Sequence, residues 1–299
     1  LFQRPTVIEI DLRNIGYNLR QFKDIISNAE LMAVIKADGY GHGAVKVAIE
    51  AIKNGATWLG VATVDEGIQL RKAGLKIPIL VVGGISPEET IDSYYNDIDI
   101  SVYSKNFIEQ IEKYAGIFKK PLNIHLKIDT GMHRIGIQPE DLPTFLKKMK
   151  GKDYIKARGI FTHFPNAAGD KEFSEEQIQS FAGSVELAED ILGEIPYKHM
   201  ANSAAIVNLP KSHFNLVRLG LGLYGYHDEE WMYEKLDIKP ALTWKTKVTS
   251  IREVPAGTRI GYGRTYTVDK DSKIATVPVG YADGYKRLLS NRGSVLVKG

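Results

Sequence analysis

Residues 31–62, LMAVIKADGYGHGAVKVAIEAIKNGATWLGVA, form the stretch that decides the fold. An apolar, β-rich run ends at Lys36 and passes into a glycine-rich loop. Apolar residues then recur at the i, i+3, i+4, i+7 spacing of one helix face until Gly55 closes the pattern. This stripe consists of Val45, Ala48, Ile49 and Ile52. A second β-rich run follows from Trp58, so the stretch predicts a strand, a helix and a parallel strand.

The same alternation continues along the chain and gives eight β-rich runs. They are residues 31–36, 58–62, 77–82, 98–103, 122–128, 155–162, 198–202 and 216–222. Strands that alternate with helices pair in parallel through right-handed crossovers. Eight such units in about 200 residues match the size of a closed (β/α)8 TIM-type barrel, with a doubly wound open sheet as the alternative.

The pattern changes after about residue 240. Residues 242–248, 258–260 and 273–279 are β-rich, and turn residues rather than helical stripes separate them. We therefore expect a barrel over residues 1–239 and the start of a mostly β C-terminal domain over residues 240–299. A short strand at about residues 6–12 could join the β domain.

Composition narrows the class of partner. Lys and Arg number 39 against 36 Asp and Glu, a net charge of +3 without any basic block, which predicts no binding to nucleic acid or to an anionic membrane. With no cysteine, disulfides and thiolate metal sites are excluded, and we expect no metal. No apolar run reaches the roughly 20 residues of a membrane helix, and residues 1–11 lack a signal-peptide core. A cytoplasmic protein acting on a small molecule is expected.

Lys36 stands out because functional residues of such barrels lie where the strands end. A lysine that ends an apolar strand is destabilised by desolvation unless it is neutral, paired or covalently used. A desolvated amine is also the form that makes Schiff bases. The alternative is that the side chain extends its ammonium group to solvent. Gly39, Gly41 and Gly43 would let the backbone approach an anion closely.

The string VIKADGYGHG, residues 34–43, resembles the pyridoxal-phosphate lysine motif of bacterial alanine racemases. Further segments match that family in order over nearly the whole chain. They are GATWLGVA (55–62), KIDTGMHRIG (127–136), HMANSAA (199–205), RLG (218–220), GYGRTY (261–266) and GYADG (280–284). The resemblance implies a barrel that binds pyridoxal 5'-phosphate, followed by a β domain, which agrees with the pattern of strands.

By this resemblance Lys36 holds the cofactor as an internal aldimine and is one catalytic base, and Tyr262 is the other. Inverting a carbon requires removing the α-proton on one face and returning a proton on the opposite face, which one side chain does not reach. In this family the tyrosine comes from the neighbouring subunit, so the resemblance implies a homodimer with shared active sites. Without the resemblance, Tyr262 would be interpreted merely as an aromatic residue in a strand.

A free tyrosine titrates near pH ~10, so it acts as a base only where positive charge favours the phenolate. The resemblance implies His163 as the partner of Tyr262 and Arg218 as the next link, although His163 alone indicates a core histidine. Arg218 would also face the pyridine nitrogen of the cofactor. Because arginine only donates and stays protonated, that nitrogen would accept a hydrogen bond and remain uncharged. A neutral ring is a poorer electron sink, which favours racemisation over transamination.

Ser203 and Gly220 follow the seventh and eighth predicted strands, where barrels of this class bind phosphate. Asn202 and Ser203 also match a helix N-cap, which is compatible with that role. The resemblance implies that the Tyr40 hydroxyl binds the same phosphate.

Arg134 and Tyr281 are implied to bind the substrate, Arg134 through a planar fork suited to a carboxylate. A surface salt bridge is the alternative for Arg134. Lys127 matches a lysine that is often carbamylated in the family and that orients this arginine.

The resemblance implies interconversion of L- and D-alanine, which supplies D-alanine for peptidoglycan. The alternatives are a serine or broader-specificity racemase of the same family, or a non-catalytic pyridoxal-phosphate-binding protein. Family chains continue beyond the position of Gly299, so we expect the β domain to be incomplete in this sequence.

Overall fold

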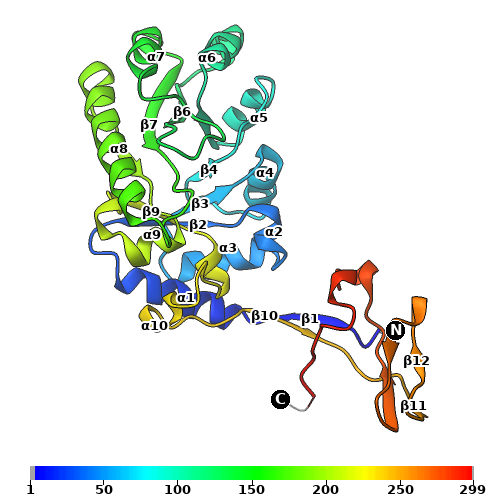
Figure 1. Ribbon diagram of the computed structural model, residues 1–299. Coiled ribbons are helices and arrows are strands. Elements are labelled where there is room, and N and C mark those ends of the chain that lie inside the picture. The colour runs from blue at the N-terminus through cyan, green and yellow to red at the C-terminus, as the bar shows by residue number, and fades with distance from the viewer. Residues whose placement is uncertain (1–3, 298–299) are drawn as a thin grey trace. The chain divides into compact units, whose positions relative to one another are not determined.

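Eight β-rich segments pair in parallel into one sheet, in the order β8-β7-β6-β5-β4-β3-β2-β9 (Figure 1). The computed structural model describes residues 4–297. The strands of this sheet are β2 (Glu30–Val34), β3 (Trp58–Val61), β4 (Ile79–Val81), β5 (Asp99–Val102), β6 (Leu122–Lys127), β7 (Ile155–Phe161), β8 (Tyr197–His199) and β9 (Leu216–Leu219). Every residue of β3, β4, β5 and β9 is buried, as expected where both faces of a parallel sheet are covered. The predicted (β/α)8 barrel is confirmed.

Helices lie outside the sheet and connect its strands (Figure 1). They are α1 (Leu12–Asp24), α2 (Lys36–Tyr40), α3 (Ala44–Lys53), α4 (Val64–Lys72), α5 (Glu89–Tyr95), α6 (Lys105–Ile111), α7 (Leu142–Met149), α8 (Lys171–Leu192), α9 (Ser203–Asn208) and α10 (Met232–Lys235). Short 3-10 turns are η1 (Glu112–Ile117), η2 (Pro210–Ser212) and η3 (Leu221–Tyr224).

The buried face of α3 differs from the predicted one. The helix buries Ala44, Val47, Ala48 and Ala51, whereas Ile49, which we placed inside, is 37% exposed. Small alanine side chains allow a helix to approach its neighbours closely, and this face packs into the main core cluster. The predicted stripe therefore shares Ala48 with the inner face, Val45 and Ile52 lie partly buried at its border, and only Ile49 faces outward.

The two strands nearest the candidate site are shorter than predicted. β2 ends at Val34 rather than at Lys36, and β9 ends at Leu219 rather than at residue 222. In both places the chain leaves the extended conformation: Ile35 has φ −121° and ψ 22°, and Gly220 has φ −106° and ψ −101°. Lys36 and Gly220 therefore lie in the loops that follow the strands.

Arg218 bridges the point where the first and last strands of the sheet order, β8 and β9, come together. Its backbone N–H donates to the Ala201 carbonyl at 2.9 Å. Its guanidinium donates to the carbonyls of His199 (2.9 Å), Thr162 (2.7 Å) and Met200 (3.1 Å). One buried side chain thus satisfies three carbonyls at the carboxyl ends of β7 and β8.

The second unit combines residues 4–10 with residues 242–297, and Asp11–Ala241 forms the barrel unit. Its strands are β1 (Val7–Ile10), β10 (Leu242–Lys245), β11 (Ser250–Val254), β12 (Arg259–Ile260), β13 (Tyr266–Thr267) and β14 (Ser272–Thr276). They pair antiparallel as β1 with β10, β11 with β14 and β12 with β13. Three 3-10 turns accompany them, η4 (Tyr262–Arg264), η5 (Tyr281–Asp283) and η6 (Arg287–Leu289).

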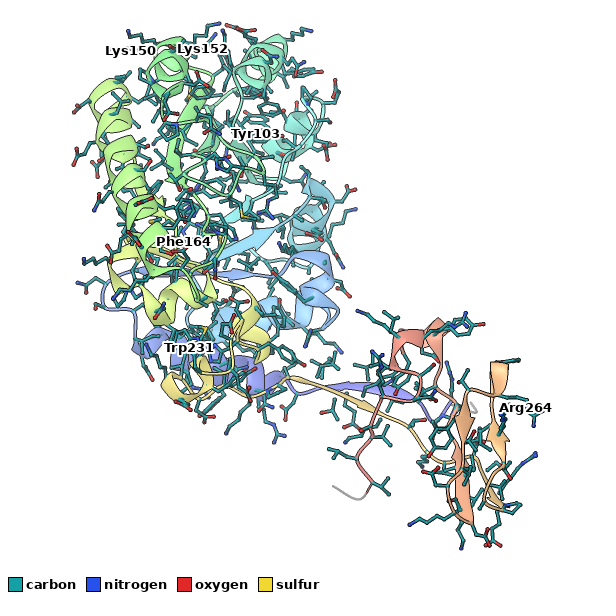
Figure 2. The ribbon with its side chains drawn as sticks, viewed as in Figure 1. Tyr103, Lys150, Lys152, Phe164, Trp231 and Arg264 are labelled. Atoms are coloured by element: carbon teal, nitrogen blue, oxygen red, sulfur yellow. The ribbon has the colours of Figure 1, made fainter. Side chains whose placement is uncertain are left out.

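Figure 2 labels a residue on each side of β7. Lys152 precedes β7 and lies at the top of the barrel unit in this view, and Phe164 follows β7 and lies nearer the middle of the unit. Over residues 4–297 no helix has the length and apolar character needed to cross a membrane.

Candidate active site

A cavity of about 190 Å³ opens at the carboxyl ends of the barrel strands. All eight site residues predicted for the barrel line it: Lys36, Tyr40, Lys127, Arg134, His163, Ser203, Arg218 and Gly220. The remaining lining residues are Val34, Val82, Phe161, Asn202, Leu221 and Asp228.

Lys36 begins a left-handed turn. Ala37, Asp38, Gly39 and Tyr40 have φ between 52° and 62°, a conformation that costs a non-glycine residue roughly 1–2 kcal/mol. Such strain persists only where the surroundings fix the chain. The Asp38 carboxylate accepts the Ala44 N–H at 2.8 Å.

Glu66 of α4 fixes the start of this turn. One carboxylate oxygen accepts the Ala37 N–H and the other accepts the Ala62 N–H, both at 2.7 Å. Glu66 therefore ties the residue after Lys36 to the end of the neighbouring strand. In the sequence, Glu66 is only the fourth residue of a Thr63-Val64-Asp65-Glu66 capping pattern, and nothing in that spacing reveals the long-range contact.

Replacing Glu66 by glutamine is expected to destabilise the protein by about 1–3 kcal/mol, because one of the two backbone N–H groups loses its acceptor. Urea unfolding of the cofactor-free protein measures the change. Asp65→Asn, an exposed carboxylate of the same helix turn, is the control and should shift stability by under about 1 kcal/mol. Equal shifts in both variants would contradict the anchoring role.

The cavity is strongly cationic. Burial, together with the Arg134 charge, lowers the pKa of Lys36, and the Glu66 charge opposes this. Burial lowers the pKa of Lys127 to about 7 and that of Arg218 to about 9. A site of this kind suits an anionic ligand, and it favours the neutral, nucleophilic amine of Lys36.

His163 is neutral, and one of its two ring nitrogens can be identified as the one that carries the proton. The Arg218 guanidinium donates to His163 Nδ1 at 3.1 Å, and because arginine only donates, the His163 proton must lie on Nε2. Burial, followed by the Arg218 and Lys127 charges, holds the pKa of His163 well below its usual range. His163 therefore serves the cavity as a neutral donor, and the positive charge beside it belongs to Arg218.

Tyr40, Ser203 and Gly220 form a cradle of donors on one side of the cavity. Ser203 Oγ accepts the N–H groups of Gly220 (3.0 Å) and Gly222 (3.1 Å), which leaves its own O–H free to donate. A Cβ on Gly220 would lie 3.4 Å from the Tyr40 hydroxyl and would fill this space. The predicted N-cap is also present, since Asn202 accepts the Ala205 N–H at 3.0 Å.

Arg134 makes no ion pair or side-chain hydrogen bond within residues 4–297, so the surface salt bridge considered from sequence is absent there. Its loop is shaped by Asp129, which accepts the N–H groups of Gly131 (3.1 Å) and His133 (2.9 Å). Lys127 Nζ lies 4.7 Å from the centre of the Phe161 ring. Its pKa is lowered by both arginines, Arg218 and Arg134.

Lys127 is expected to make stability depend on pH. Between pH 7 and 9 the unfolded chain binds a proton at Lys127 (ordinary pKa 10.5), whereas the folded chain, with a pKa of about 7, does not. Stability therefore rises with pH, by up to about 1.4 kcal/mol per unit. Urea unfolding of cofactor-free protein in CO2-free buffer measures this slope. Lys127→Met should flatten it, and an unchanged slope in that variant would refute the assignment.

Tyr262 and Tyr281 lie in the second unit, unlike the other predicted site residues. Tyr262 opens η4, in the connection between the paired strands β12 and β13, and is fully exposed. Tyr281 opens η5 and is 75% exposed.

Sequence reasoning did not assign Asp228, Leu221, Val82 or Phe161 to the site. Asp228 follows an ordinary loop, and the aliphatic and aromatic residues resemble any barrel core, so no local pattern distinguishes them. Within residues 4–297 no group of three or more potential metal ligands is present.

Two family models match this chain. The model for the N-terminal domain of alanine racemase matches residues 10–228, and the model for its C-terminal domain matches residues 241–299. Among curated relatives, the alanine racemase of Halothermothrix orenii is 42% identical over 99% of this chain and 79% of its own length. That of Carboxydothermus hydrogenoformans is 43% identical over 99% of this chain and 81% of its own.

Solved structures of alanine racemases are also similar to this chain. An alanine racemase from Streptomyces lavendulae has a TM-score of 0.95 at 33% identity, and the match covers 100% of this chain and 80% of that one. The Bacillus anthracis alanine racemase with bound L-Ala-P has a TM-score of 0.88 at 34% identity, with coverage of 97% and 76%.

Proposed function

Since this chain belongs to the alanine racemase family, we propose that its barrel cavity interconverts L- and D-alanine and that Lys36 and Tyr262 move the proton. The observation that supports this most is the position of Lys36, whose pKa is lowered by burial, in the loop that follows β2 and in a cationic cavity. The product D-alanine would serve peptidoglycan synthesis, and we expect the enzyme to act in the cytoplasm.

The cavity residues fit pyridoxal 5'-phosphate. Lys36 would bind its aldehyde carbon, and the Ser203 hydroxyl, the Tyr40 hydroxyl and the space beside Gly220 would receive the phosphate. None of the hydrogen bonds within residues 4–297 uses Arg218 Nε, which would donate to the pyridine nitrogen. When bound, the cofactor acidifies the α-proton of an amino acid by delocalising the resulting charge.

Lys36 would take or return the proton on one face of the α-carbon, and Tyr262 on the other. Lys36 is suited to this because its lowered pKa makes the neutral amine available. We propose that Tyr262 enters the cavity of a neighbouring subunit in a homodimer. A fully exposed tyrosine in the connection between two strands is consistent with an interface residue, since tyrosine combines an apolar ring with a polar tip.

His163 and Arg218 would set the protonation of Tyr262. His163, neutral and carrying its proton on Nε2, can donate that proton's hydrogen bond to a phenolate oxygen. Arg218 contributes the positive charge behind it. Because Arg218 stays protonated, it would keep the pyridine nitrogen uncharged, which limits the electron withdrawal and favours return of the proton to the α-carbon.

Arg134 would bind the substrate carboxylate through its planar fork, and Tyr281 would line the substrate's path. Lys127 would orient Arg134 after carbamylation. Because the pKa of Lys127 is about 7, much of its amine is neutral, which is the form that reacts with CO2. The resulting carbamate is an anion, so Arg134 and Arg218 would attract it, whereas they repel the protonated lysine. Intact-mass analysis in bicarbonate buffer should show the added mass of one CO2, absent in Lys127→Ala.

The proposal is tested by the loss of optical rotation from L-alanine, with pyridoxal 5'-phosphate added and L-serine run in parallel. Faster loss with alanine is expected. Faster loss with serine would reassign the substrate within the family, and no loss with either from protein that binds the cofactor would reject the catalytic proposal in favour of a cofactor-binding protein.

A further inference from the structure

A row of polar side chains crosses the interior of the barrel, where branched aliphatic residues usually pack. Asp99 begins β5, His125 lies on β6, His199 ends β8 and Arg218 lies on β9. Each is at least 95% buried. The row starts at the amino-terminal end of the sheet, at Asp99, and ends in the cavity, at Arg218.

Hydrogen bonds connect every member of this row. Arg218 Nη1 lies 3.0 Å from His199 Nδ1, and His199 Nε2 lies 2.9 Å from His125 Nδ1. His125 Nε2 lies 3.3 Å from an Asp99 carboxylate oxygen. Arg158 of β7 donates to both oxygens of that carboxylate, at 3.2 and 3.3 Å.

The chemistry of the two ends fixes every proton between them. Arg218 only donates, so His199 Nδ1 accepts and the His199 proton lies on Nε2. His125 Nδ1 must then accept, which places its proton on Nε2, directed at the Asp99 carboxylate. Asp99 accepts from both His125 and Arg158. Both histidines are neutral in this arrangement, in agreement with the lowering of the pKa of each by burial.

Aromatic rings and one glycine pack around the row. The His199 ring stacks on Phe161, with centroids 4.8 Å apart, and the Trp58 ring meets His125 edge-on at 5.3 Å. The Arg158 guanidinium lies 4.6 Å from the Trp58 ring centre. Gly159 leaves the room that the His125 ring occupies, because a Cβ at 159 would overlap His125 Nδ1.

We propose that Asp99 and Arg158, at the far end of the barrel from the cavity, are positioning residues for Arg218, acting through the His125–His199 pair to fix the direction of every hydrogen bond along the row. With His199 Nδ1 held as an acceptor, Arg218 Nη1 has a fixed partner and the guanidinium plane keeps one orientation in the cavity. The consequence for catalysis rests on the function proposed above, whereas the proton positions do not.

The proton positions are tested on cofactor-free protein labelled with ¹⁵N at histidine. Two-bond ¹H–¹⁵N correlation spectra distinguish the two neutral tautomers from the charged ring. We expect His125 and His199 to show the neutral Nε2–H form without titration from pH 6 to 9, with assignment from His125→Gln and His199→Gln. A charged ring or an Nδ1–H form at either residue would overturn the proposal, whatever the activity.

Variants at Asp99 then separate positioning from general stability. Asp99→Leu removes the carboxylate that accepts the His125 Nε2 proton, so the spectrum of His199 should no longer show a single tautomer. We expect kcat to fall about tenfold with little change in KM. Tenfold is the lower end of the loss seen when residues that hydrogen-bond to metal ligands are mutated. Asp99→Asn retains an amide oxygen that can accept from His125 Nε2, so most of the wild-type tautomer signal of His199 and most of kcat should be retained. Asp97→Asn, which removes the exposed ion pair with Lys120 and no hydrogen bond of the row, is the matched control, although the Asp97 charge also acts on Arg158.

An Asp99→Leu protein that folds and retains the wild-type His199 tautomer would refute the proposal. Gly159→Ala provides an independent route if Asp99→Leu does not fold, because it displaces His125 without removing a charge. Its control is Gly183→Ala in α8, where an added Cβ meets nothing within 4 Å. If the tautomer changes while kcat stays the same, the proposed proton positions along the row stand and its effect on catalysis is rejected.

Discussion

Replacement of Lys36 by alanine is expected to abolish both the visible absorbance of the bound cofactor and racemase activity, with a loss of at least about 10⁴-fold in kcat. Lys36 has two proposed roles, as the covalent attachment point and as a base, and no neighbouring amine replaces it. Lys127 lies in the same cavity, but on β6, and Lys36 alone follows β2 in the left-handed turn. Absorbance spectra and the alanine assay measure the two losses.

Borohydride reduction sharpens this test, since it makes the attachment permanent and peptide mass analysis then locates it. The modification should lie on the peptide that contains Lys36. Lys53→Ala, an exposed lysine of α3, is the control and should retain both spectrum and turnover. Modification of Lys127, or a wild-type spectrum in Lys36→Ala, would assign the cofactor to another lysine.

Replacement of Tyr262 by phenylalanine is expected to leave the cofactor spectrum intact and to lower kcat by about 10²–10⁴-fold, the usual contribution of a general acid–base group. Only the hydroxyl is lost, and Tyr262 lies outside the barrel unit that would hold the cofactor. Proton removal from L-alanine should suffer most, because Lys36 still serves the opposite face. Exchange of the α-proton in D2O, followed separately for each enantiomer, measures the asymmetry.

Tyr266→Phe is a close control, because it removes a half-exposed hydroxyl from β13 in the same unit and should leave turnover near wild type. Mixing Lys36→Ala chains with Tyr262→Phe chains tests whether sites are shared between subunits. Mixed dimers should regain part of the activity through one intact site. No recovery in dimers shown to be mixed would place both bases in one chain.

The barrel could be predicted because alternation of strands and helices is a property of the whole chain, and an error of a few residues in any one strand leaves the count unchanged. The ends of β2 and β9 could not, because Ile35 and Gly220 leave the extended conformation within apolar sequence. Lys36 could be singled out from its place at the end of an apolar run, whereas its role and the assignment of Arg218 came from resemblance to family motifs. Tyr262 and Tyr281 also came from that resemblance, and their roles stay predictions.

Glu66 and Asp99 illustrate what sequence conceals. The pattern Thr63-Val64-Asp65-Glu66 predicts a capping box, and the Thr63 hydroxyl does accept the Glu66 N–H at 3.3 Å. The Glu66 carboxylate, however, binds Ala62 and Ala37, and the second of these contacts exists only because two βα loops meet in space. Asp99 likewise begins an ordinary strand, and its link to Arg218 passes through two residues from other strands.

The three carbonyl contacts of Arg218 tie the reaction type of this enzyme to the integrity of its scaffold. A mutational path that exchanged this arginine for a carboxylate, in order to convert the racemase into a transaminase, would also remove the side-chain donor of three carbonyl oxygens and of two histidines. The intermediate sequence would then be less stable, and this loss would act before any new activity could be selected. Redesign of the chemistry must begin by rebuilding the junction of β8 and β9, and natural drift away from racemisation is restrained at the same position.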